Sequence, residues 1–154
     1  MKRREFNRKL ATITGLGVGV TSGLLPVSTL ASWPTAAFDT ETVNDAKNAL
    51  FGESEMIETD AITFKAPDIA ENGRVVPVSI NVGLNNIQEI ALMVPENPAP
   101  LVTTFVMSDQ SNVSVGTRIK MGKTSPLVAV VKADGKVYTA SSKEIKVTIG
   151  GCGG

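Results

Sequence analysis

Residues 76–94 read VPVSINVGLNNIQEIALMV, and in two parts of this stretch apolar side chains recur at every second position. The alternating positions are Val76, Val78, Ile80 and Val82, and then Ile90, Leu92 and Val94. Successive side chains of a β-strand point to opposite faces of the sheet, so a period of two predicts half-buried strands. Pro77 lies inside the first pattern and cannot donate a ladder hydrogen bond, and we therefore expect an edge or bulged strand there.

The same alternation begins at Ile57 and ends at Ile149. It predicts further strands near Ile62 and over residues 101–107, 113–121, 127–131, 137–140 and 145–149. Turn-forming residues separate them, at Asn72-Gly73, residues 95–100, Gly122 and Asp134-Gly135, and the last of these is a strong hairpin signal. About seven short strands with this spacing predict an all-β fold, an antiparallel β-sandwich of immunoglobulin-like type.

One short helix is expected before the strands, over residues 40–51. Asp39 or Thr40 can cap its N-terminus, and Gly52 can end it. Its apolar face consists of Val43, Ala46 and Leu50. We expect this helix to pack at the edge of the domain.

The N-terminus resembles an export signal of the twin-arginine type. Residues 1–31 carry five basic side chains and one acidic one, including Arg3-Arg4, and continue into an uncharged, Gly- and Thr-rich stretch. A transmembrane helix is the competing interpretation, but five positions hold Gly or Pro, which are poor helix-interior residues: Gly15, Gly17, Gly19, Gly23 and Pro26. Thr29 and Ala31 frame a small-residue cleavage site, so we expect cleavage after Ala31. Asn7 departs from the usual twin-arginine pattern, which leaves the general secretory route open.

These boundaries predict four parts of the chain. Residues 1–31 are the signal peptide, residues 32–56 a helical segment, residues 57–149 the sandwich domain, and residues 150–154 a flexible arm. The mature form is expected to contact neither membrane nor nucleic acid.

Composition excludes several kinds of chemistry. The chain has no histidine, so Ser-His-Asp, Cys-His and zinc-histidine sites are absent, and we expect no metal, no cofactor and no catalytic residues. Residues 32–154 carry ten basic and fourteen acidic side chains, with nine of the acids in residues 39–71. Such clusters, and the basic set Arg118, Lys120 and Lys123, are either solvated faces or charge-steered docking surfaces.

The chain ends in Gly150-Gly151-Cys152-Gly153-Gly154, and Cys152 is its only cysteine. Glycine removes steric cover and leaves the backbone free, so these residues predict a mobile arm with a reach of about 17 Å. A catalytic cysteine needs a base and an oxyanion hole fixed around it, whereas a carrier thiol only has to be presented to enzymes that supply them. The sequence therefore predicts a non-catalytic carrier with Cys152 as the covalent attachment point.

Four alternatives remain beside the carrier. The terminus can be frayed with an incidental cysteine, or Cys152 can form an intermolecular disulfide in an exported structural module. The chain can be a thiol-dependent enzyme in its own right, which would turn over substrate alone. The terminal Gly154 carboxylate can be converted to a thiocarboxylate, but that activation needs ATP, which an exported protein lacks.

The terminal motif resembles that of SoxY, the carrier subunit of the bacterial Sox thiosulfate-oxidation system, whose hallmark is a C-terminal Gly-Gly-Cys-Gly-Gly. The resemblance extends over essentially the whole chain. It includes the signal, the helix before Phe51, residues 71–78, Asn97-Pro98, residues 117–121 and residues 147–149.

This resemblance implies a location, a set of partners and a chemistry. It implies a periplasmic heterodimer with SoxZ, in which a haem-containing SoxXA protein joins thiosulfate oxidatively to Cys152 as an S-thiosulfonate. SoxB then hydrolyses off sulfate and leaves a persulfide. Where SoxCD is present, that sulfane dehydrogenase oxidises the remaining sulfur, and SoxB releases it.

Overall fold

The computed structural model of the protein describes residues 34–148. The chain separates into two units, Met1–Ser32 and Trp33–Gly154, and all the described residues belong to the second. The predicted signal peptide, its cleavage site after Ala31 and the arm at residues 150–154 with Cys152 lie outside the described residues. Among the helices of residues 34–148, none has the length and apolar character that a membrane span requires.

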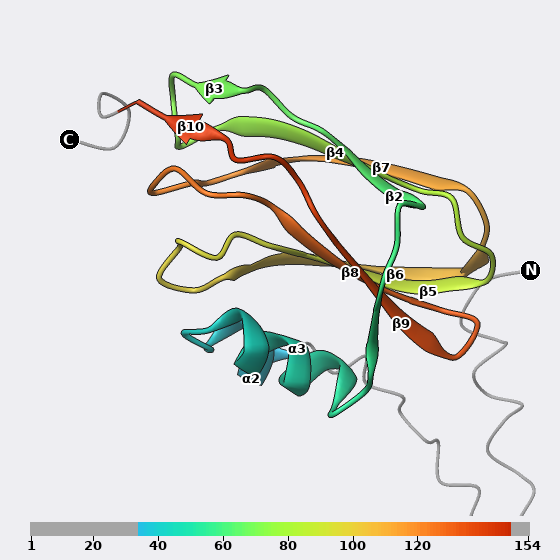
Figure 1. The fold of residues 1–154 in the computed structure, drawn as a ribbon. Helices are drawn as coiled ribbons and strands as arrows, with labels where there is room; N and C mark the ends of the chain where they lie inside the picture. The colour runs from blue at the N-terminus through green and yellow to red at the C-terminus, as the bar shows by residue number, and fades with distance from the viewer. Residues whose placement is uncertain (1–33, 149–154) are drawn as a thin grey trace, which may run out of the picture. The chain divides into compact units, whose positions relative to one another are not determined.

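The larger sheet has five strands in the order β1-β9-β8-β5-β6 (Figure 1). These strands are β1 (Met56–Glu58), β5 (Ile87–Met93), β6 (Leu101–Gln110), β8 (Val128–Ala133) and β9 (Lys136–Ser141). Neighbours run antiparallel except β1 and β9, which are parallel. Asp134 and Gly135 join β8 to β9 with φ of 49° and 69°, the left-handed conformation that a type I′ hairpin turn requires. The hairpin predicted there is confirmed.

The other five strands form two smaller sheets. One is antiparallel in the order β2-β4-β7, and the other is a parallel pair of β3 and β10. Their bounds are β2 (Ile62–Lys65), β3 (Ile69–Ala70), β4 (Val76–Val82), β7 (Val113–Ile119) and β10 (Lys146–Val147). The all-β sandwich of immunoglobulin-like type is confirmed. Residues 34–148 contain ten strands rather than about seven, because strands of two or three residues, such as β1 and β3, are too short to show a period.

Pro77 does not make β4 an edge strand, and that prediction was wrong: β4 is the middle strand of its sheet and pairs with both β2 and β7. Backbone groups of alternate strand residues point to the same side, and the N–H of Gly83 donates to the carbonyl of Ala61 in 2.8 Å. Pro77 therefore faces the β2 side as well. The β2–β4 ladder ends where Lys65 faces Ser79, two residues from Pro77, so no partner strand needs a donor at that position.

The five-stranded sheet is covered on both faces. The core between the sheets includes Val76, Val78, Ile80 and Val82 of β4, Ile90 and Leu92 of β5, and Ala129 and Val131 of β8. A second cluster on the opposite face includes Ala91, Met93, Leu101, Val128, Val130 and Val137. Two helices, α2 (Thr35–Phe38) and α3 (Val43–Phe51), pack on this second cluster through Ala37 and Ala46 (Figure 1).

The helix prediction needs two corrections. The helix covers a sheet face, not an edge of the domain, because β5 and β8 are apolar on both sides. It begins at Val43 and is capped by Thr42, whose hydroxyl accepts from the N–H of Asp45 in 3.1 Å. Asp39 ends the preceding helix α2, and the Thr40 hydroxyl donates to Ala37, so neither expected residue caps α3.

Candidate functional site

The structure describes residues 145–148, the segment directly before the predicted C-terminal arm, and we call this segment the base. Strand β10 lies parallel to β3, and the backbone N–H of Lys146 donates to the carbonyl of Asp68 in 3.0 Å. The N–H of Thr148 donates to the carbonyl of Ala70 in 3.2 Å, and the Thr148 hydroxyl to the carbonyl of Glu71 in 3.3 Å. The chain is therefore hydrogen-bonded to the domain up to the last residue before the undescribed terminus.

A second set of contacts holds the opposite side of this base. Ile145 and Ser125 exchange two backbone hydrogen bonds, of 3.0 Å and 3.2 Å, and the N–H of Val147 donates to the Thr124 hydroxyl in 3.0 Å. The Ile145 side chain is 2% exposed and belongs to the core between the sheets. The base of the arm is thus a continuation of the core.

The predicted site residues themselves are not described by the structure. Cys152 and the glycines Gly150, Gly151, Gly153 and Gly154 lie outside the described residues, so their role as attachment point and arm stays a prediction. Cys152 is four residues beyond Thr148, and four residues of extended chain span at most about 14 Å. This length sets the greatest distance between the thiol and the anchored base.

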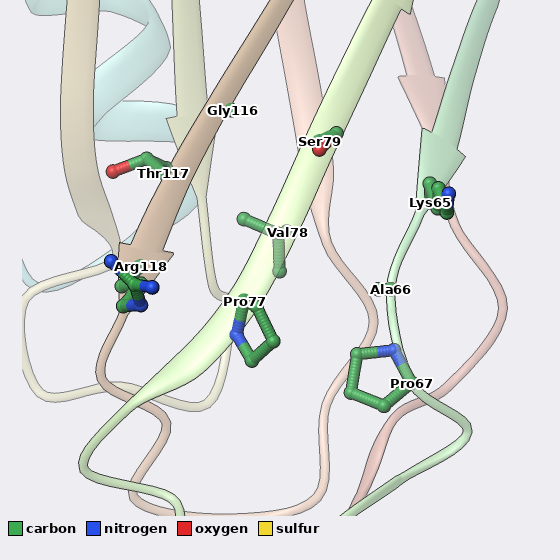
Figure 2. Close-up of a pocket in the computed structure, with 9 residues that line it drawn as sticks. All are labelled: Lys65, Ala66, Pro67, Pro77, Val78, Ser79, Gly116, Thr117 and Arg118. Atoms are coloured by element: carbon green, nitrogen blue, oxygen red, sulfur yellow. The ribbon is translucent and has the colours of Figure 1, made fainter.

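A hollow of about 950 Å³ lies on the outer face of the three-stranded sheet (Figure 2). We call it the hollow and define it by six of its lining residues: Lys65, Pro67, Pro77, Ser79, Gly116 and Arg118. The register of β2 on β4 would place Pro67 opposite Pro77, and neither proline has an N–H to donate. The ladder stops at this proline pair, and the space beyond its end becomes part of the hollow.

The floor of the hollow is formed by small side chains. Ser79 faces Gly116 across the β4–β7 ladder, and Pro77 faces Arg118. A Cβ added at Gly116 would lie 3.4 Å from the Ser79 hydroxyl oxygen, so the missing side chain leaves room above the sheet. Lys65 and Arg118 stand on opposite sides of β4 in Figure 2, with Ser79 between them.

Arg118, which the sequence analysis grouped with Lys120 and Lys123, lines the hollow together with Lys65. The Lys120 carbonyl accepts from the side-chain amide of Asn97 in 2.8 Å, and this amide also accepts from the N–H of Gly122 in 3.0 Å. Lys65 is far from Arg118 in the sequence, and only the β2-β4-β7 strand order makes them neighbours. No local sequence pattern could have paired them.

Glu89 is a half-buried acid on β5, away from the hollow. Burial raises the pKa of its carboxyl group, and the positive charge of Lys132, its cross-strand partner on β8, opposes that rise.

Within residues 34–148 no group of three or more His, Cys, Asp or Glu side chains is arranged to hold a metal ion.

Comparison with known proteins places the chain in a family. Residues 47–152 match the family model described as "Sulfur oxidation protein SoxY". The chain is also similar to the structure of the sulfur carrier protein SoxY from Chlorobium limicola f thiosulfatophilum, with 41% sequence identity and a TM-score of 0.64. That similarity covers 70% of this chain and 97% of the Chlorobium chain. No curated protein matches the chain. The family model spans well over half of the sequence, and the 41% identity extends over nearly all of the Chlorobium chain. The chain therefore belongs to the SoxY family of sulfur oxidation proteins.

Proposed function

We propose that the protein is a carrier, not an enzyme, which holds sulfur intermediates covalently on Cys152 during thiosulfate oxidation. The observation that carries this proposal is the extent of the family match, which continues through Cys152 itself. The related Chlorobium protein is named a sulfur carrier, which supports the same role. The absence of histidine from the chain agrees with chemistry supplied by partner proteins.

The carried states follow from the chemistry of a thiol and thiosulfate. Joining the Cys152 thiol to thiosulfate forms a sulfur–sulfur bond and releases one proton and two electrons, which the haem-containing SoxXA protein would accept. The product is the S-thiosulfonate, Cys–S–S–SO₃⁻. Hydrolysis by SoxB would then release sulfate and leave a persulfide, and SoxCD, where the host has it, would oxidise the remaining sulfur. Cys152 returns to the free thiol after the final hydrolysis.

The described part of the structure fits a carrier that has a fixed base and a reactive end. Hydrogen bonds hold the chain to the domain as far as Thr148, so the base cannot be drawn out without breaking them. Beyond it, Cys152 is flanked on both sides by glycines, which add no side-chain bulk. A thiol on such a segment could enter a narrow catalytic cleft of a partner.

We further propose that the protein works in the periplasm as a heterodimer with SoxZ. Residues 1–31 would direct export, with cleavage after Ala31, and the mature protein would consist of residues 32–56, the sandwich at 57–149 and the arm at 150–154. The twin-arginine route exports proteins already folded or assembled, and a partner subunit bound before export would account for its use by a protein with no cofactor motif.

The test is thiosulfate consumption in a mixture of the purified protein, SoxZ, SoxXA and SoxB. We expect Cys152→Ser to abolish consumption, whereas Ser142→Ala, a change outside the arm, should leave it intact. A Cys152→Ser protein that supports the wild-type rate would contradict the carrier role. A covalent dimer that disappears on reduction, without any loading by thiosulfate, would favour the structural alternative.

A further inference from the structure

The hollow carries two positive charges and no negative one. Its lining includes Lys65 and Arg118 but neither Asp nor Glu. Within residues 34–148, neither cation is joined to a carboxylate by an ion pair. Asp68, the nearest carboxylate along the chain from Pro67, lines an adjoining hollow that shares Ala66 and Pro67 with this one. An anion in the hollow would therefore meet positive charge, and no carboxylate, among the residues that line it.

The two cations are placed so that both can reach one small anion. Lys65 is on β2 and Arg118 on β7, the two strands that flank β4, and they pair with Ser79 and Pro77, so their backbones are about 12 Å apart. Both side chains are long, and the Ser79 hydroxyl lies between them (Figure 2). A guanidinium can bind two oxygens of a tetrahedral oxyanion at once, while an ammonium contributes a compact charge from the other side.

One stretch of chain connects the hollow to the residues that hold the base. Lys65, Ala66 and Pro67 line the hollow, and the next residues, Asp68 to Ala70, hold Lys146 and Thr148 through backbone hydrogen bonds. Pro67 is three residues from Ala70, a separation of at most about 10 Å. The stretch from Thr148 to Cys152 can span up to about 14 Å, so a group on Cys152 is within range of the hollow.

We propose that the hollow binds the sulfonate group of a sulfur oxoanion between Lys65 and Arg118. For the protein-bound form of this anion the inference rests on the proposed carrier function. The same –SO₃⁻ group is present in free thiosulfate and in the S-thiosulfonate on Cys152, and the experiment separates these two sources.

The first part of the experiment uses free thiosulfate and the full chain with Cys152→Ser, which cannot be loaded. The backbone amide signals of Ser79, Gly116 and Thr117 are followed by NMR during titration with sodium thiosulfate at constant ionic strength. Saturable shifts are expected. Lys65→Gln and Arg118→Gln should each weaken binding about three- to fivefold, as loss of one partly exposed charge contact predicts. Lys136→Gln, at the β8–β9 turn and outside the hollow, should leave it unchanged.

A change of shape provides a test that leaves the charges in place. Gly116→Leu puts a large side chain on the outer face of β7, where φ is not in the left-handed region and a β-strand accepts the substitution. It should abolish the shifts by filling the hollow. Wild-type thiosulfate affinity in this variant would overturn the placement of the anion.

In the second part of the experiment, Cys152 of the wild-type chain is loaded with tetrathionate. The thiolate attacks a central sulfur, forms Cys–S–S–SO₃⁻ and displaces thiosulfate, so no outside oxidant is needed. Loading is verified by intact mass before the same amide signals are compared with those of the unloaded protein. Shifts on loading that Lys65→Gln or Arg118→Gln reduces identify the protein-bound source, and shifts with free thiosulfate identify the solution source.

Absence of amide shifts in both parts of the experiment would overturn the proposal, and so would shifts that neither Lys65→Gln nor Arg118→Gln reduces. These failures differ from a failure of the carrier function. If Cys152 loads normally and the hollow shows no response, the carrier function stands and the anion site does not. If Cys152 cannot be loaded at all, the carrier function fails, while the titration with free thiosulfate still decides whether the hollow binds that anion.

Discussion

Truncation of Ile145 tests the claim that the base of the arm is part of the core. Ile145 is 2% exposed and immediately precedes β10. The change Ile145→Ala removes three carbon atoms, and at about 0.8 kcal/mol for each the lost transfer free energy is about 2.4 kcal/mol. A residual cavity adds to this loss, so we expect the free energy of unfolding to fall by about 3 kcal/mol.

The assay is urea unfolding followed by circular dichroism, with the midpoint and the m-value measured together. Ile69→Ala is the matched control: Ile69 lies on β3, pairs with Lys146 of β10 and is 55% exposed, so its truncation should cost less than about 1 kcal/mol. Ile145→Val removes one carbon and should cost about 1 kcal/mol. Equal losses for Ile145→Ala and Ile69→Ala would refute the claim that the arm begins from a buried anchor.

Three further predictions concern the rest of the described domain. Thr42→Ala removes the cap of α3 and should lower the free energy of unfolding by about 1 kcal/mol in urea titrations, whereas Thr42→Ser should retain it; equal stability of all three proteins would contradict the cap. Pro77→Ala should change stability by less than about 1 kcal/mol, because the restored N–H faces the side that β2 has left; a loss above about 2 kcal/mol would show that the ring itself is needed. Burial raises the pKa of Glu89 above its usual value near 4.5, so the folded state favours the protonated form and loses stability as pH rises through the raised pKa. Glu89→Gln should therefore have a higher urea midpoint than wild type at pH 7, with the difference shrinking as pH falls towards 4.5; a constant difference across that range would contradict this assignment.

Local patterns predicted the parts of the fold that local physics determines. The alternation of Val76 to Val82 gave β4, the Asp134-Gly135 pair gave the β8–β9 hairpin, and Gly52 ended α3 with φ of 68°. Each depends on residues within a few positions of one another, and tertiary packing did not override them.

Long-range arrangement explains what the sequence did not reveal. The role of Pro77 depends on where β2 ends, and the helix position depends on a sheet that is apolar on both faces. The run from Ile90 to Val94, apolar at every position, was the available sign of that second buried face. Lys65 and Arg118 line the same hollow only because of the strand order β2-β4-β7. Cys152, by contrast, was singled out by its immediate neighbours alone.

The most direct test of the carrier role is the intact mass of the mature protein after incubation with thiosulfate and SoxXA, before and after a thiol reductant. We expect a mass increase of one thiosulfate group, which the reductant removes and which Cys152→Ser never shows. An unmodified wild-type protein under these conditions, or the same adduct on Cys152→Ser, would contradict covalent carriage on Cys152.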